Sequence, residues 1–125
     1  MDIEKHIQYW SNSADEDFQV GKENLGNGRI RHGLFFIHLA VEKILKAHFC
    51  RNNRDMAPKS HNLTRLAELG KIEINDETLN VLADINAFNL EGRYPDSYAA
   101  PPTLEDAMII LDKVEKVFLW LKNQL

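Results

Sequence analysis

Three ionisable side chains, His38, Glu42 and Lys46, recur at four-residue steps within the most apolar stretch of the chain. Side chains at this spacing lie on the same face of a helix. One interpretation is a Glu42–Lys46 ion pair on an exposed strip of that helix, worth a few tenths of a kcal/mol. The other is a groove in which Lys46 binds an anion and His38 or Glu42 hydrogen-bonds a ligand. Because no helix carries two histidines four residues apart, we expect no metal site and no cofactor.

A second candidate is His61, which follows Pro58, Lys59 and Ser60 and precedes a short apolar segment. A histidine there can satisfy backbone groups at a helix entry. With Lys59 and Arg65 nearby, it can instead contact a phosphate. Both interpretations stay open. Cys50, by contrast, has no obvious acid or base partner, so we expect a small buried side chain rather than a nucleophile.

The densest polar and aromatic cluster is the segment from Arg93 to Tyr98. The guanidinium of Arg93 suits a phosphate, and Tyr94 and Tyr98 can stack on a base or hydrogen-bond a ligand. Alternatively, Arg93 pairs with Asp96 and pins the loop while the tyrosines cover the core. Glycine-rich phosphate loops and dinucleotide fingerprints do not occur in the chain.

Apolar periodicity places these residues on helices and the turns between them. Steps of three and four residues predict helices near 3–25 and 104–125, and a nearly all-round apolar segment predicts a central, buried helix over 31–51. A short helix over 63–69 and another from Asn75 or Asp76 to about Leu90 follow, with a break at 91–96. The fold class is therefore all-α, an antiparallel up-and-down bundle of four long helices and one short one.

The length and charge of the chain limit the classes of function that it can have. The 125 residues fit a single domain, of the common size of roughly 100–150 residues. The net charge of −4 argues against coating nucleic acid through bulk charge. Yet residues 29–71 hold nine basic and three acidic groups, so this middle segment suits an anionic partner. With no apolar run of about 20 residues and no signal-peptide pattern, we expect a cytoplasmic protein without membrane contact.

The stretch from Gly33 to Ala47, which ends in Ala-Val-Glu-Lys-Ile-Leu-Lys-Ala, resembles the second-helix signature of the HEPN domain family. The resemblance extends to Trp10 and Ala14, to Pro58 with Ser60-His61-Asn62-Leu63, and to Arg93-Tyr94-Pro95-Asp96. It implies a helical homodimer, often encoded beside a minimal nucleotidyltransferase as a toxin–antitoxin pair. Some members bind nucleotides, and others are metal-independent ribonucleases that use an Arg and a His with four to six residues between them.

The sequence departs from the ribonuclease pattern, because Tyr98 stands where a His would follow Arg93, and no His occurs after His61. Arg54 and His61 have the bare spacing, but in a different loop. The resemblance therefore favours a non-catalytic module that binds a nucleotide or RNA and is the partner of a nucleotidyltransferase. The alternatives are a ribonuclease using Arg93 with Tyr98 or His61, and a module that binds only protein. The expected ligand-binding residues are His38, Glu42, Lys43, Lys46, His61, Arg93, Tyr94 and Asp96.

Overall fold

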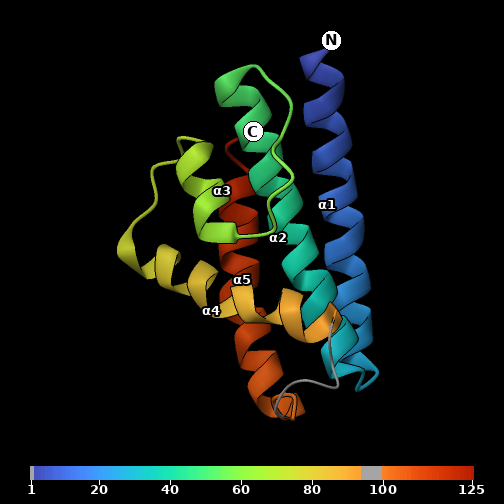
Figure 1. Cartoon of the computed structure of the whole chain (residues 1–125). Coiled ribbons are helices and arrows are strands. Elements are labelled where there is room, and N and C mark those ends of the chain that lie inside the picture. Colours follow the sequence, from blue (N-terminus) through green and yellow to red (C-terminus); the bar gives the residue numbers. More distant parts are fainter. Residues whose placement is uncertain (1, 94–99) are drawn as a thin grey trace.

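The computed structural model describes the backbone of residues 2–93 and 100–125 and the side chains of 2–89 and 100–125. In these ranges every regular element is a helix (Figure 1). They are α1 (Ile3–Gly26), α2 (Ile30–Asn53), α3 (Leu63–Leu69), α4 (Asp76–Arg93) and α5 (Leu104–Lys122). The predicted all-α fold is confirmed, and the order of one short and four long helices matches the periodicity of the sequence.

Short polar side chains cap the starts of α1, α4 and α5, as the sequence indicates. The carboxylate of Asp2 accepts a hydrogen bond from the Lys5 amide at the start of α1, and Thr103 accepts one from the Asp106 amide at the start of α5. Of the two candidates before α4, Asn75 is the cap, since its side chain accepts from the Thr78 amide at 2.8 Å. These bonds satisfy backbone N–H groups that have no partner within the helix.

The α1–α2 hairpin forms one side of the molecule, and α2 is its central helix. After α1 the chain reverses at Gly28, whose φ of +78° suits glycine, and α2 returns alongside α1 (Figure 1). Helix α2 is packed on several sides, by α1, α3, α4 and α5. This burial explains why its apolar residues cover most of its circumference.

Helix α4 runs obliquely across α2 and α5 (Figure 1). We expected α4 to end near Leu90, with a break from Glu91 onward; instead, it continues to Arg93. Gly92 therefore lies within the last turn of the helix and does not end it. A single glycine near a helix end costs only about 1 kcal/mol, which neighbouring backbone hydrogen bonds can offset. Residues 94–99 of the predicted loop lie outside the described residues.

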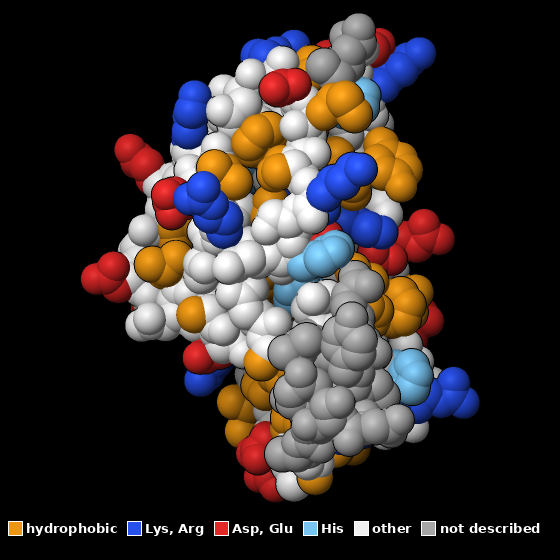
Figure 2. All heavy atoms as spheres, viewed as in Figure 1, with side chains coloured by type: hydrophobic (Ala, Val, Ile, Leu, Met, Phe, Trp, Pro, Cys, Tyr) orange, Lys and Arg blue, Asp and Glu red, His pale blue; other side chains and the backbone are white. Residues whose placement is uncertain are grey.

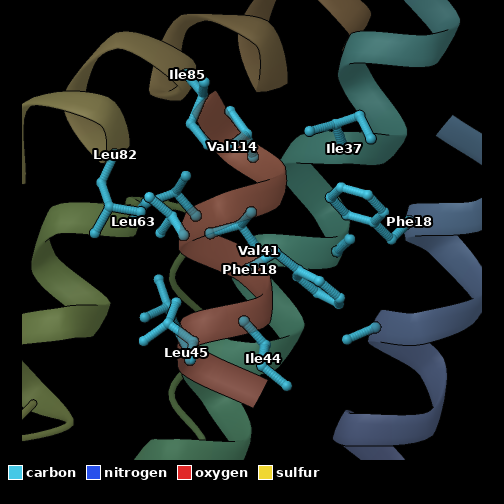
Figure 3. Packing of buried hydrophobic residues seen from close by; sticks show 14 of the residues in the cluster. Phe18, Ile37, Val41, Ile44, Leu45, Leu63, Leu82, Ile85, Val114 and Phe118 are labelled. Carbon is cyan, nitrogen blue, oxygen red and sulfur yellow. The ribbon is translucent and has the colours of Figure 1, made fainter. Parts of the chain in front are cut away.

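The core is continuous and draws on all five helices (Figure 3). Phe18 of α1 stacks on Phe118 of α5 with ring centroids 4.5 Å apart. On the side of the core away from α1, the cluster ends at Leu63 of α3 and at Leu82 and Ile85 of α4. None of the helices in the described residues is long and apolar enough to cross a membrane.

Candidate functional site

A buried carboxylate, that of Glu42, is the centre of the candidate site. Glu42 is only 4% exposed, and two cationic or titratable side chains reach it from different elements. Its Oε2 accepts a hydrogen bond from Lys46 Nζ at 3.0 Å, and its Oε1 lies 3.0 Å from His61 Nδ1. His38 Nδ1 is 3.9 Å from the same Oε1. Buried carboxylates need such partners, because an isolated buried charge is strongly unfavourable.

The expectation of an exposed Glu42–Lys46 pair is wrong. The pair forms, but Lys46 is only 6% exposed, and its Nζ also lies 5.2 Å from the centroid of the Trp10 ring of α1. The ammonium group is thus held between a carboxylate and an aromatic face. Lys46 is therefore engaged in the protein interior and is not displayed to an external anion. The sequence placed the pair correctly along the helix, but α1 and the segment after α2 bury it.

His61 is the part of this cluster that reaches the surface. Its side chain is 48% exposed, although its Nδ1 contacts the buried Glu42. An ionised carboxylate can only accept, so the hydrogen of the neutral ring lies on Nδ1 and leaves Nε2 for another partner. A carboxylate behind a histidine fixes the orientation of the ring. His61 is thus oriented either to bind an anion or to transfer a proton.

The backbone around His61 is anchored by asparagine side chains. Asn62 caps α3, and its Oδ1 accepts from the Arg65 amide, from Thr64 Oγ1 and from Asn86 Nδ2. In return, Asn86 Oδ1 of α4 accepts from the Leu63 amide at 2.8 Å. His61 therefore precedes a segment that is fixed to α4, so its position does not depend on the loop alone.

A shallow pocket of about 240 Å³ lies at this junction, lined by His61, Asn62, Asn86 and Asn89. Figure 2 shows histidine side chains in the middle of one face of the molecule, with Lys and Arg side chains beside them. Lys59, two residues before His61, is exposed. The exposed part of the site is thus a histidine, carboxamides and a cation, groups that bind phosphate and ribose oxygens.

The expected site residues divide into three groups. The structure brings His38, Glu42, Lys46 and His61 together. It does not add Lys43, whose Nζ points to α1, 2.6 Å from Asp17 Oδ2 and 2.7 Å from Ser13 Oγ. The Arg93 side chain and residues Tyr94, Asp96 and Tyr98 lie outside the described residues.

Three further residues of the site, Asn62, Asn86 and Asn89, had escaped the sequence analysis. Asn86 is one, because nothing near it in the sequence indicates that it will meet Asn62. Asn62 had a recognisable signal, since an Asn directly before an apolar helical segment is a common helix cap. Cys50 is buried, and burial raises the pKa of its thiol, as fits a packing role. No group of three or more His, Cys, Asp or Glu residues in the described ranges is arranged to hold a metal ion.

Comparison with known proteins assigns the family. The family model described as the HEPN domain matches residues 7–124. The chain belongs to the HEPN domain family. The HEPN match includes residues of all five helices, the Glu42 cluster (His38, Glu42, Lys46 and His61) among them.

Two solved structures share this HEPN fold. The crystal structure of TT1696 from Thermus thermophilus superposes with a TM-score of 0.80 at 20% identity, covering 95% of this chain and 98% of that chain. ST0689, an archaeal HEPN homologue, gives a TM-score of 0.73 at 20% identity, with 94% and 96% covered. At this identity the likeness is one of fold alone. No curated protein matches the chain.

Proposed function

We propose that this HEPN protein is a non-catalytic module that binds the phosphate of a nucleotide or RNA at His61. The observation that carries the proposal is the contact between His61 Nδ1 and Glu42 Oε1, at 3.0 Å. The buried carboxylate fixes the orientation of the ring, so that Nε2 is directed away from Glu42 and is available to a ligand phosphate. Lys59, which is exposed and lies two residues before His61 in the chain, adds a positive charge. Arg93, Tyr94 and Asp96 remain proposed ligand contacts on sequence grounds.

The roles of the buried residues follow from their contacts. Glu42 holds His61, and Lys46 neutralises Glu42, so neither needs to touch the ligand. His38 extends the same polar row along α2. We therefore assign direct binding to His61 and a supporting role to His38, Glu42 and Lys46. Lys43 supports the hairpin through Asp17 instead.

Calorimetry with a panel of nucleoside monophosphates and a short single-stranded RNA tests the binding proposal. We expect binding to the wild type and a loss of about tenfold or more in His61→Gln, since hydrogen bonds to charged groups contribute roughly 1.5–3 kcal/mol. Exposed His32 gives a matched control, because His32→Gln removes a histidine away from the Glu42 cluster. Equal affinity in wild type and His61→Gln would refute the assignment.

A metal-independent ribonuclease is the second candidate. It is favoured by the same Glu42–His61 contact, because a carboxylate-held histidine is also suited to proton transfer. Incubating the protein with total RNA in the presence of a metal chelator separates the two functions. Cleavage that disappears in both His61→Gln and Arg93→Ala would identify an enzyme. Intact RNA together with measurable binding supports the non-catalytic module.

The proposed partners are a second copy of the chain and a minimal nucleotidyltransferase, in a toxin–antitoxin type of pair. The family resemblance supports both. For the homodimer, α5 also carries large exposed apolar side chains, namely Met108, Ile109, Leu119 and Trp120. We expect light scattering to give twice the chain mass, and Ile109→Glu to shift it toward one. Co-purification with the product of a neighbouring nucleotidyltransferase gene tests the second partner.

A further inference from the structure

A second pocket, of about 360 Å³, lies between the first turns of α1 and the segment that follows α2. Its volume falls within the range of small-molecule sites, roughly 300–1,000 Å³. Two of its side chains are unusually exposed for their type, Tyr9 at 62% and Met56 at 59%. The pocket is lined by Lys5, His6, Tyr9, Trp10, Met56 and Ala57.

The lining suits a flat ring that is attached to an anionic group. The rings of Tyr9 and Trp10 meet edge to face, with centroids 5.1 Å apart and planes at 72°. The thioether of Met56 comes from the other element, so apolar and aromatic surface is offered from two sides. Lys5 and His6 add groups that carry or can carry positive charge. Aromatic side chains beside cations are the usual means of binding bases of single-stranded nucleic acids.

Two links join this pocket to the candidate site. Trp10 lines the pocket, and its ring faces Lys46 Nζ, which bonds the carboxylate that holds His61. The segment after α2 also carries Met56 at the pocket and His61 at the site, with exposed Lys59 between them. Figure 2 shows hydrophobic side chains on the same face as the histidines, with Lys and Arg side chains in between.

We propose that the pocket between Tyr9 and Met56 binds the base of the nucleotide or RNA whose phosphate lies at Lys59 and His61. This inference rests on the proposed function and adds a base subsite to it. The occupant is aromatic and anionic, since the ring stacks against Tyr9 and Met56 while the cations meet the phosphate. Stacking is sequence-tolerant, so several bases fit.

Fluorescence of Trp10 reports directly on this pocket. The chain has two tryptophans, and Trp120→Phe leaves Trp10 as the only one. In that background we expect AMP, GMP, CMP, UMP and the nucleoside adenosine to change the Trp10 emission. Ribose 5-phosphate, which has no base, binds without that change.

Substitutions of the pocket side chains test the stacking. We expect Tyr9→Ala and Met56→Ala each to weaken AMP binding by about tenfold, as loss of a stacking surface does. Tyr9→Phe keeps the ring and the affinity. Leu79→Ala, which truncates an exposed apolar side chain of α4, is the control and leaves AMP binding unchanged. Ribose 5-phosphate affinity stays the same in all four variants.

The outcomes separate this inference from the proposed function. If nucleotides bind in a His61-dependent way but adenosine leaves Trp10 unchanged and Tyr9→Ala has no effect, the base subsite is refuted and the phosphate site stands. If adenosine and AMP perturb Trp10 but His61→Gln does not alter AMP affinity, the base subsite stands and the phosphate assignment fails. Self-association that Tyr9→Ala abolishes, without any response to nucleotides, would assign the pocket to a second copy and overturn the inference.

Discussion

At the scale of single residues, the molecule keeps one carboxylate in its interior and surrounds it with groups that can be positively charged. Glu42 would be strongly unfavourable alone, but Lys46 and His61 each lie 3.0 Å from one of its oxygens. Because Lys46 contacts Glu42 and the Trp10 ring, its charge is compensated within the protein. The arrangement directs the only substantially exposed member, His61, outward.

The Glu42–Lys46 pair leads to a stability prediction. Lys46→Met removes one partner and leaves Glu42 short of charge compensation, so we expect a loss of about 3 kcal/mol in the free energy of unfolding. Adding Glu42→Gln to Lys46→Met removes the uncompensated charge and should restore part of that loss. Urea denaturation gives the free energies of unfolding of the wild type, both single variants and the double variant. Together these four values give the interaction energy between Lys46 and Glu42.

The exposed pair Lys22–Glu115, at 2.8 Å between Nζ and Oε2, provides the control cycle. Exposed pairs couple by only about 0.2–1 kcal/mol. Strictly additive effects of Lys46→Met and Glu42→Gln would contradict the buried-pair explanation.

Part of this site could be predicted from the sequence, and part could not. The four-residue spacing of His38, Glu42 and Lys46 defines a row on one helix, and helix geometry alone predicts it. The contact of His61 with Glu42 joins residues 19 positions apart through a loop, which no local pattern encodes. For the same reason the sequence could not show that Trp10 and the loop bury Lys46.

At the scale of elements, the close approach of α1 and α2 depends on two glycines that face each other. A Cβ added to Gly21 would lie 3.0 Å from the carbonyl oxygen of Gly33, and one added to Gly33 would lie 3.1 Å from the carbonyl oxygen of Gly21. Next to these backbones, Leu25 and Ile37 fill the remaining space. The hairpin that places Trp10 against Lys46 therefore depends on small residues at its crossing.

The Gly33 position gives a prediction for this crossing. In Gly33→Ala the new methyl group would meet Leu25 Cγ at 2.6 Å, so the side chain and helix must shift. We expect a loss of about 1–3 kcal/mol in the free energy of unfolding, as for other overpacked sites. Thermal and urea unfolding, followed by circular dichroism, measure it.

Gly26 supplies the comparison, because a Cβ there meets nothing within 4 Å and the residue ends α1. Gly26→Ala should be neutral or slightly stabilising, since alanine favours helix. If the two alanine variants were equally stable, close helix contact would not be the reason for Gly33.

Most helices were predictable because their signals are local. Periodic apolar steps defined α1 and α5, and Gly70 stopped α3 where expected. The end of α4 was not predictable, since Gly92 does not interrupt the helix in its folded setting. A weak local signal of this kind is overridden by the surrounding structure.

At the scale of the whole molecule, the end of the chain is joined to the central helix. His48 of α2 is buried, and its Nε2 donates to the Leu121 carbonyl oxygen of α5 at 2.8 Å. One turn further, Arg51 Nη1 donates to the Gln124 carbonyl oxygen. These bonds satisfy carbonyl groups at the C-terminal end of α5 and hold it against α2.

This connection makes global stability depend on pH. Burial lowers the pKa of His48 below its ordinary 6.5, the hydrogen bond to Leu121 opposes that shift, and the charge of Arg51 reinforces it. Between the lowered pKa and 6.5, the unfolded chain binds a proton at this position that the folded chain does not. Stability contributed by neutral His48 is therefore fully present above pH 6.5 and is lost as pH falls toward the folded pKa.

Unfolding free energies measured between about pH 4.5 and 8 test this sign. We expect the wild type to lose up to about 1.4 kcal/mol per pH unit more than His48→Gln in the acidic part of that range. His48→Gln keeps an N–H donor but has no titrating group. At the alkaline end of the range His48 is neutral, so any difference in unfolding free energy between the two proteins there reports the loss of packing alone. His32→Gln, at an exposed position, should keep the wild-type slope. A slope that is the same in His48→Gln as in the wild type would show that other groups, and not the junction of α2 with α5, set the acid sensitivity of the fold.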